Sequence, residues 1–354
     1  MLRICSLRQI EAGICEEHKE AQEGKTGISI EEIHRQHTSR GGQMKEKVGF
    51  VGLGTIGAPM ARRVANGGYQ LVVYDVRPEA MRPFAEKGAT AASSPKDVAT
   101  KCSNILFSLP DSPIIEEVIL GKDGIVDGAA RGTLIVDLSS AHPASTIKLG
   151  KELAPKGIDI IDAPVSGGRF GAEAGTLAVM VGGRKELLER ARPIISTFGK
   201  TIFHCGELGS GDTVKAVNNF LSAMSFIGTG EALILATKAG LDPQTALDVI
   251  NASSGQNKAS SGKFKELVMR GDFDRAKSMS MRLFYKDLST AADLGAKLGV
   301  PMFIIPIIQQ LLAYGVAMCG PESPNTELIR TMEQWVGVKV RDRDILAKEE
   351  KTSR

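Results

Sequence analysis

The sequence is poor in the residues on which several kinds of site depend. Its 354 residues include five cysteines, which are scattered and never spaced as Cys-x-x-Cys. Neither a disulfide framework nor a structural zinc site is therefore expected, and a cytoplasmic location fits best. Only two of the five histidines, His142 and His204, lie beyond residue 40. A histidine-based triad or a multi-histidine metal site is poorly supplied, so we expect no metal and a different acid or base.

The sequence also lacks an excess of one charge. Its 44 basic and 41 acidic residues are interspersed and leave a formal net charge of +3, so no nucleic-acid partner is expected. One apolar stretch, 220–237, is long enough to raise the question of a membrane span. Asn218 and Asn219 precede it and Glu231 lies inside it. We interpret it as the buried central helix of a helical domain and expect no membrane partner.

Glycine, in contrast, is abundant, with 39 residues. The first glycine cluster follows a predicted strand and precedes a predicted helix over 58–66. Its spacing, G-x-G-x-x-G, is typical of a dinucleotide site: Gly52 allows a tight turn, Gly54 lets the backbone approach a pyrophosphate, and Gly57 lets the helix pack on the strand. The helix start adds free N–H groups for the phosphates. We predict that the cofactor lies on the segment Gly52-Leu53-Gly54-Thr55-Ile56-Gly57.

An acidic residue indicates which dinucleotide is bound. Asp75 ends the next predicted strand, where its carboxylate can accept hydrogen bonds from the adenosine ribose and repel a 2′-phosphate. This position favours NAD. Arg77, two residues later, could pair with a 2′-phosphate, so NADP remains a possible cofactor.

The pattern of apolar runs predicts two domains, as the length of the chain also suggests. Short apolar runs alternate with helical patterns up to residue 208, which predicts βαβ units and a mostly parallel sheet. Beyond it only helical patterns follow. We expect an α/β Rossmann-type N-terminal domain (47–208), an all-α C-terminal domain (209–340) and a charged tail (341–354). The predicted strands are 47–51, 71–75, 89–92, 104–109, 133–138, 159–163, 177–181 and 201–203; the later predicted helices are 212–238, 243–254, 261–270, 281–298, 301–318 and 322–335.

The first 46 residues differ from the rest of the chain. They mix charges without a strand or a long apolar stripe, and they resemble neither a signal peptide nor a transit peptide. We expect residues 1–46 to be a disordered extension or the product of a start site placed too early, with Met44 as the natural first residue.

A second glycine cluster follows the predicted strand 159–163. The segment Asp162-Ala163-Pro164-Val165-Ser166-Gly167-Gly168 opens into a glycine-rich loop that reaches Thr176. Small residues let backbone N–H groups converge, and the Ser166 hydroxyl adds a donor, an arrangement that suits a carboxylate. A tight turn between two strands is an equally good interpretation.

A lysine near the start of the long predicted helix could supply the acid or base. Lys215 and Asn219 are four residues apart and share one face. Polar side chains on so apolar a helix are costly unless they are paired or used, and a buried lysine with a lowered pKa can exchange a proton. The alternative is a surface lysine at the beginning of a helix.

These motifs, with Lys215-Ala216-Val217-Asn218-Asn219 and Tyr285-Lys286-Asp287-Leu288, resemble the β-hydroxyacid dehydrogenases, which include 3-hydroxyisobutyrate dehydrogenase and tartronate semialdehyde reductase. The resemblance runs from about Lys47 to Val340. It implies that Lys215 is the catalytic acid/base and that Asn219 orients it or the substrate oxygen. It further implies cofactor contacts by Leu109, Pro110 and Ser140, a contact of Lys286 with cofactor or substrate, and a substrate carboxylate held by Ser166, Gly167 and Gly168.

The resemblance implies reversible hydride transfer between NAD and a small β-hydroxy acid of the 3-hydroxyisobutyrate, glycerate/tartronate semialdehyde or threonate class. Polar side chains over 251–257, together with Arg169 and Phe170, favour a hydroxylated acid. A homodimer or homotetramer is expected. A non-catalytic dinucleotide-sensing or scaffold protein is the alternative; the presence of Lys215 and the lack of a basic arm speak against it.

Overall fold

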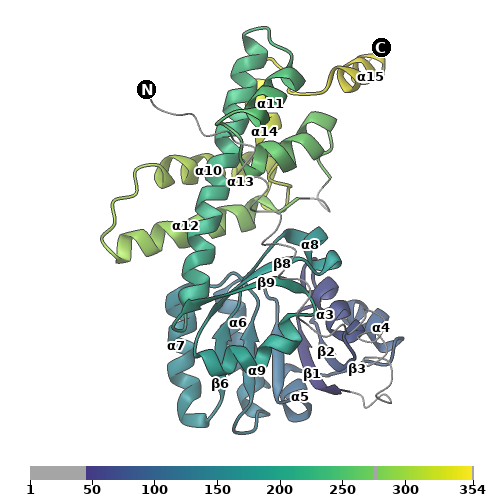
Figure 1. Cartoon of the computed structure of the whole chain (residues 1–354), viewed down its shortest axis with the longest axis vertical. Coiled ribbons are helices and arrows are strands. Elements are labelled where there is room, and N and C mark those ends of the chain that lie inside the picture. The colour runs from purple at the N-terminus through teal and green to yellow at the C-terminus, as the bar shows by residue number, and fades with distance from the viewer. Residues whose placement is uncertain (1–44, 275–277, 353–354) are drawn as a thin grey trace, which may run out of the picture. The chain divides into compact units, whose positions relative to one another are not determined.

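The computed structural model describes residues 45–274 and 278–352 (Figure 1). The expectation of an extension over residues 1–46 falls outside these residues except for Lys45 and Glu46, with which the first strand begins. The described residues form a sheet flanked by helices, followed by a group of helices. This is the predicted α/β Rossmann-type fold with an all-α C-terminal part.

The sheet has nine strands within the described residues, in the order β3-β2-β1-β4-β5-β6-β8-β7, with β9 beside β8. The pairs β1–β4, β2–β3, β4–β5 and β5–β6 are parallel, whereas β8 runs antiparallel to β6 and β7. The prediction of a mostly parallel sheet is confirmed, and β7 was missed because two residues show no alternation. The strands are β1 (Lys45–Val51), β2 (Tyr69–Tyr74), β3 (Thr90–Ala91), β4 (Asn104–Phe107), β5 (Leu134–Asp137), β6 (Asp159–Asp162), β7 (Val165–Ser166), β8 (Leu177–Gly182) and β9 (Gly199–Gly206).

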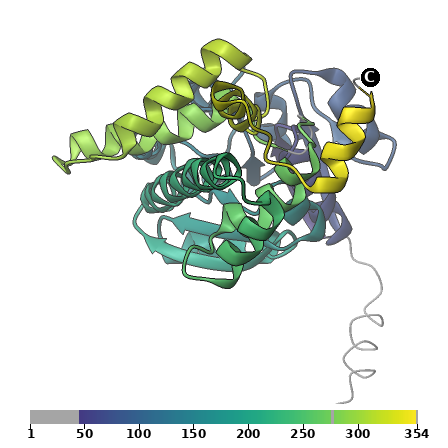
Figure 2. The ribbon, with the colours of Figure 1, turned by 90° about the horizontal axis from the view of Figure 1, so that it is seen from above.

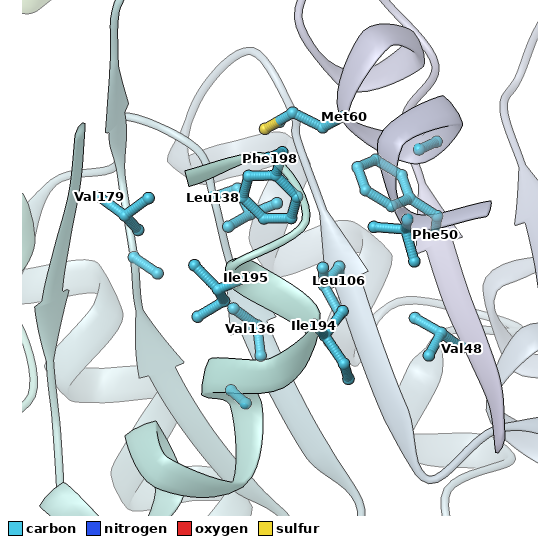
Figure 3. Packing of buried hydrophobic residues seen from close by; sticks show 14 of the residues in the cluster. Val48, Phe50, Met60, Leu106, Val136, Leu138, Val179, Ile194, Ile195 and Phe198 are labelled. Atoms are coloured by element: carbon cyan, nitrogen blue, oxygen red, sulfur yellow. The ribbon is translucent and has the colours of Figure 1, made fainter. Parts of the chain in front are cut away.

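Both faces of the sheet are buried because successive side chains of a strand point to opposite sides. Phe50, Leu106 and Val136 belong to one apolar cluster, which Figure 3 shows packed beside Ile194 and Phe198. Their chain neighbours Val51 and Phe107 belong to a second cluster. The covering helices are α3 (Gly57–Asn66), α4 (Pro78–Ala85), α5 (Pro95–Lys101), α6 (Ser112–Leu120), α7 (Pro143–Leu153), α8 (Gly168–Ala174) and α9 (Lys185–Ile195). Helix α8 replaces most of the loop that was expected after Gly168.

The long helix α10 (Ser210–Lys238) contacts β8 and β9 as well as the helices that follow it (Figure 1). By length and composition it could cross a membrane, and less than half of its most apolar stretch is buried. It is central among the helices of the C-terminal part, as predicted, but only partly buried. Helices α12 (Met281–Lys297) and α13 (Ile305–Cys319) lie side by side against it (Figure 2). The predicted helix 261–270 is instead a π-helix, η3 (Ala259–Phe264), and a short 3₁₀ turn (Val268–Arg270). The other helices are α11 (Pro243–Ala252), α12 (Met281–Lys297), α13 (Ile305–Cys319), α14 (Glu327–Val336) and α15 (Arg343–Thr352).

The segment expected to be a charged tail contains α15 and a buried ion pair. Arg341 is 3% exposed, and its Nη1 lies 2.6 Å from Glu333 Oε1. Cys102, Cys205 and Cys319 carry free thiols. The cytoplasmic location inferred from the scattered cysteines stays a prediction.

Candidate active site

The first glycine cluster forms the turn between β1 and α3. Gly52 has a φ of +89°, and a Cβ at this position would overlap the Ser108 carbonyl oxygen; a Cβ at Gly57 would overlap the Gly52 carbonyl oxygen. At Gly54, in contrast, a Cβ would meet no atom within 4 Å. The turn is therefore tight on the protein side and open at Gly54, where the backbone can approach a phosphate. It lies between β1 and β4, where the direction of strand succession reverses.

The start of α3 suits an anion. Its N-cap residue Ile56 makes no side-chain cap, and its first turn contains no acidic residue. Pro59 has no N–H, and the N–H groups of Ala58 and Met60 donate to the carbonyl oxygens of Gly54 and Ile56. The Gly57 N–H and the helix dipole are left for a negatively charged group. The cradle fits the diphosphate of a dinucleotide.

Asp75 lies at the end of β2 beside this turn. Its carboxylate is 7% exposed and accepts hydrogen bonds from the Leu53 N–H (2.7 Å) and the Arg77 N–H (2.9 Å). The Arg77 guanidinium pairs with it at 3.1 Å. Burial opposes ionisation, but the bonds from Arg77 and Leu53 outweigh it and lower the pKa of Asp75. The carboxylate is therefore charged at neutral pH, and Arg77 is held against it.

The loops after β4 and β5 approach the helical part of the chain. The Leu109 N–H donates to Ser139 Oγ at 2.9 Å. Lys286 of α12 donates to the carbonyl oxygens of Ser140 (2.7 Å) and Pro110 (3.4 Å). Lys286 thus contacts the same backbone that was expected to contact the cofactor.

Lys215 lies one turn into α10 and is partly buried. It makes no hydrogen bond or ion pair with the residues that the structure describes, whereas Asn219 Nδ2 donates to Asp287 Oδ2 at 2.7 Å. Asp287 also pairs with Lys286 at 3.0 Å. Burial lowers the pKa of Lys215; the charge of Asp287 opposes this shift and that of Lys286 adds to it. An unpaired lysine with a lowered pKa gives or takes a proton more readily at neutral pH than an ordinary lysine does.

The second glycine cluster and Lys215 are connected through Asp162. This residue ends β6, and its carboxylate accepts from the N–H groups of Gly209 and Asp212, both at 2.8 Å, at the start of α10. Ser166 follows in β7, and Gly167 and Gly168 have φ values of +134° and +61°. The cluster is thus a strand-to-helix connection at the edge of the sheet that also holds the start of α10.

Three buried carboxyl groups, those of Asp137, Asp162 and Asp212, surround the start of α10. Asp212 Oδ2 accepts from the Thr146 hydroxyl at 2.7 Å. Burial raises the pKa of all three, that of Asp137 to about 7, and the negative charge of Asp162 raises the pKa of the other two further. Sequence reasoning assigned these carboxyls no role, because their proximity depends on strand ends far apart in the chain.

Asp287 is another residue that sequence reasoning missed. The motif Tyr285-Lys286-Asp287-Leu288 contains it, but its buried position beside Asn219 follows only from the packing of α10 on α12. The burial of Asp287 could have been predicted from Phe284 and Leu288. These two apolar residues are four apart and buried, and Asp287 lies on the same face of the helix.

The polar segment 251–257 is largely occupied with local bonds. The side-chain Oδ1 of Asn257 accepts from the N–H groups of Ala259 and Ser260 at 2.9 and 3.0 Å, and its Nδ2 donates to Thr229 Oγ1 at 3.1 Å. Arg169 pairs with Glu173 at 2.8 Å. The polar side chain of Asn257 therefore caps the start of η3, so its polarity is no sign of a hydroxylated substrate.

Both parts of the chain match models of domains from related dehydrogenases. Residues 47–206 match the model described as the NAD binding domain of 6-phosphogluconate dehydrogenase. Residues 209–332 match the model described as the NAD-binding domain of NADP-dependent 3-hydroxyisobutyrate dehydrogenase. The two matches divide the chain close to the start of α10.

Individual relatives agree with these models. The chain is 40% identical to a 2-(hydroxymethyl)glutarate dehydrogenase of Eubacterium barkeri over 294 residues, which cover 83% of this chain and 97% of that protein. It is 41% identical to the mitochondrial 3-hydroxyisobutyrate dehydrogenase of Rattus norvegicus over 218 residues, covering 62% and 65%. A solved structure of the Mycobacterium tuberculosis 3-hydroxyisobutyrate dehydrogenase with L-serine superposes with a TM-score of 0.74 at 29% identity, over 81% of this chain and 98% of that one.

Proposed function

Since the chain belongs to the β-hydroxyacid dehydrogenase family, we propose that it oxidises a small β-hydroxy acid reversibly with NAD and that Lys215 is its general acid/base. The observation that carries this proposal is the unpaired, partly buried Lys215 beside the Asn219–Asp287 hydrogen bond. Lys286 connects that group to the loops at Pro110 and Ser140. The acid/base is thus next to the backbone proposed to contact the cofactor.

The names of the relatives suggest a substrate geometry. 3-Hydroxyisobutyrate, 2-(hydroxymethyl)glutarate and L-serine each carry a carboxylate and a hydroxymethyl group on the same carbon, and they differ in the third substituent. We propose the same arrangement for the substrate of this chain. Ser166, Gly167 and Gly168 would bind the shared carboxylate, and the hydroxymethyl group would lie at Lys215.

One group of residues would bind the dinucleotide, and a second group would transfer the proton. The open cradle at Gly54 and the carboxylate of Asp75 would hold the dinucleotide, which supplies the hydride acceptor when bound. In oxidation, neutral Lys215 takes the hydroxyl proton as the hydride leaves the adjacent carbon. In reduction, the protonated lysine returns a proton to the carbonyl oxygen. Asn219, fixed by Asp287, holds the substrate oxygen in line.

The test is Lys215→Ala, assayed for NAD⁺ reduction with a panel of β-hydroxy acids and for NADH binding by fluorescence. We expect turnover to fall by about 10²- to 10⁴-fold with NADH binding retained. Lys238→Ala is the matched control, because Lys238 lies on the same helix and bonds to the Val336 carbonyl oxygen. Undiminished turnover in Lys215→Ala would refute the role of the lysine. NADH binding without turnover in the unmodified protein would instead favour a dinucleotide sensor.

We also propose that the chain forms a homodimer or homotetramer. Large apolar side chains are exposed on the helical part: Leu235 of α10 (71%), Phe303 (85%) and Ile307 of α13 (72%). Such side chains usually mark an interaction surface when they gather. Light scattering with size-exclusion chromatography tests this, and a monomer at micromolar concentration would contradict it.

A further inference from the structure

A second lysine of the helical part lacks an ionic partner. Lys263 lies in η3, with its Nζ 5.3 Å from the centre of the Phe226 ring and 5.7 Å from that of Phe284. It forms no hydrogen bond or salt bridge with residues 45–274 or 278–352. Burial alone lowers its pKa, to about 8. A cation among aromatic rings gains some stabilisation from their faces, but its desolvation calls for an anion as well.

The surroundings of Lys263 continue the site at Lys215. Phe226 follows Asn219 on α10 by seven residues, two helical turns, which places both on one face about 10 Å apart along the axis. Phe284 precedes Asp287 on α12 by one turn. The hydrogen bond from Asn219 to Asp287 joins these helices, and η3 contacts α10. Lys263 therefore lies along the same interface between α10 and α12 as Lys215, farther from the sheet. We call this interface the α10–α12 seam.

The two other lysines of this seam already have a partner or a role. Lys286 donates to two carbonyl oxygens and pairs with Asp287. Lys215 is needed at the hydroxyl group under the proposed function. A further anionic group of the substrate, a few carbon atoms from the reacting centre, would find its counter-ion in Lys263.

We propose that Lys263 binds a second carboxylate of the substrate, so that the chain selects a β-hydroxy dicarboxylic acid over a monocarboxylic one. This inference rests on the proposed function. The first carboxylate lies at Ser166–Gly168, the hydroxymethyl group at Lys215, and the acidic arm extends along the seam to the ammonium group of Lys263.

The kinetic test compares 2-(hydroxymethyl)glutarate with 2-(hydroxymethyl)pentanoate, which has an uncharged arm of similar length. We expect the unmodified protein to favour the dicarboxylate. In Lys263→Met, the ratio of the two kcat/KM values should fall about 10- to 100-fold, as for the loss of one charged hydrogen bond. Lys263→Arg should keep part of the preference, and Lys265→Met, a change at an exposed neighbour, should keep all of it. An equal loss for both substrates, or no preference in the unmodified protein, would overturn the inference.

A binding experiment separates this inference from the proposed function. The NADH complex is titrated calorimetrically with glutarate and with butyrate. Glutarate should bind at least tenfold more tightly, and Lys263→Met should remove the difference. If glutarate depends on Lys263 but no acid is turned over, the proposed function fails and the carboxylate site stands. If acids are turned over but glutarate binds no better than butyrate, the inference about Lys263 fails and the proposed function stands.

Discussion

Replacing Asp75 by serine removes an acceptor on which three neighbouring donors converge. The carboxylate takes the Leu53 N–H, the Arg77 N–H and the Arg77 guanidinium. Serine is too short to bond to all of them. The substitution therefore releases Arg77, whose side chain is already 56% exposed, while the glycine turn loses one bond.

The size of the effect follows from these contacts. A hydrogen bond to a charged group contributes about 1.5–3 kcal/mol, so losing the proposed bond between Asp75 and the ribose should weaken NAD⁺ binding roughly 10- to 150-fold. For NADP⁺ the sign is opposite. Two unit charges 4 Å apart repel by about 4 kcal/mol at an effective dielectric constant of 20, and this repulsion disappears. We expect the kcat/KM ratio of NAD⁺ over NADP⁺ to fall by more than about 100-fold.

The assay measures initial rates with each cofactor at a fixed, saturating hydroxy acid. Arg77→Ala is the first control, since it leaves Asp75 in place and should keep the preference for NAD⁺. The double variant Asp75→Ser/Arg77→Ala should lose most of the gained NADP⁺ activity, because no cation then meets the 2′-phosphate. A folded Asp75→Ser protein whose cofactor ratio stays within threefold of the original would refute the reasoning.

Three further predictions concern the turn and the buried carboxyls. Asp287→Asn removes a charge that raises the pKa of Lys215, so the pH profile of acid oxidation should move to lower pH; an unmoved profile would contradict this. Burial raises the pKa of Asp212 above its value in the unfolded chain, so the native state keeps a proton on this carboxyl that the unfolded chain releases above about pH 4. Asp212 therefore stabilises the fold less as pH rises above about 4. In urea titrations, Asp212→Asn should be less destabilising at pH 8 than at pH 5, and the reverse order would count against it. Gly57→Ala, which places a Cβ on the Gly52 carbonyl oxygen, should lower NADH affinity at least tenfold in fluorescence titrations, and unaltered affinity would show that the turn can relax.

The parts of the fold that depend on local sterics could be predicted from the sequence. The glycine motif alone locates the cradle. At Gly57 the nearby Gly52 carbonyl oxygen leaves no room for a Cβ, whereas the contact of Gly52 with the Ser108 carbonyl oxygen depends on the neighbouring strand. The sheet is also accessible from sequence, because strands buried on both faces form continuous apolar runs. The two-residue strand β7 and the π-helical form of η3 have no such signal.

The polar arrangement of the site was less accessible. Asp287 bonds to Asn219 across 68 positions of the chain, and Lys263 meets Phe226 and Phe284 only because three helical segments converge. Periodicity shows which face of a helix is buried but not which polar groups meet there. The polarity of Asn257 was misleading for the same reason, since its amide is bonded to its own neighbourhood.

The anchoring of α10 by Asp162 has a mechanical consequence. The carboxylate fixes the first turn of a 29-residue helix to the sheet, which makes that turn the pivot of any small rotation of the helix. At 1.5 Å per residue, Lys215 is about 8 Å from the pivot and Phe226 about 24 Å. A tilt of about 5° would displace the lysine backbone by about 0.7 Å and that of Phe226 by about 2 Å. Under the proposed function, the acid/base Lys215 thus lies where the lever arm is short, and a small tilt of α10 would displace it less than Phe226.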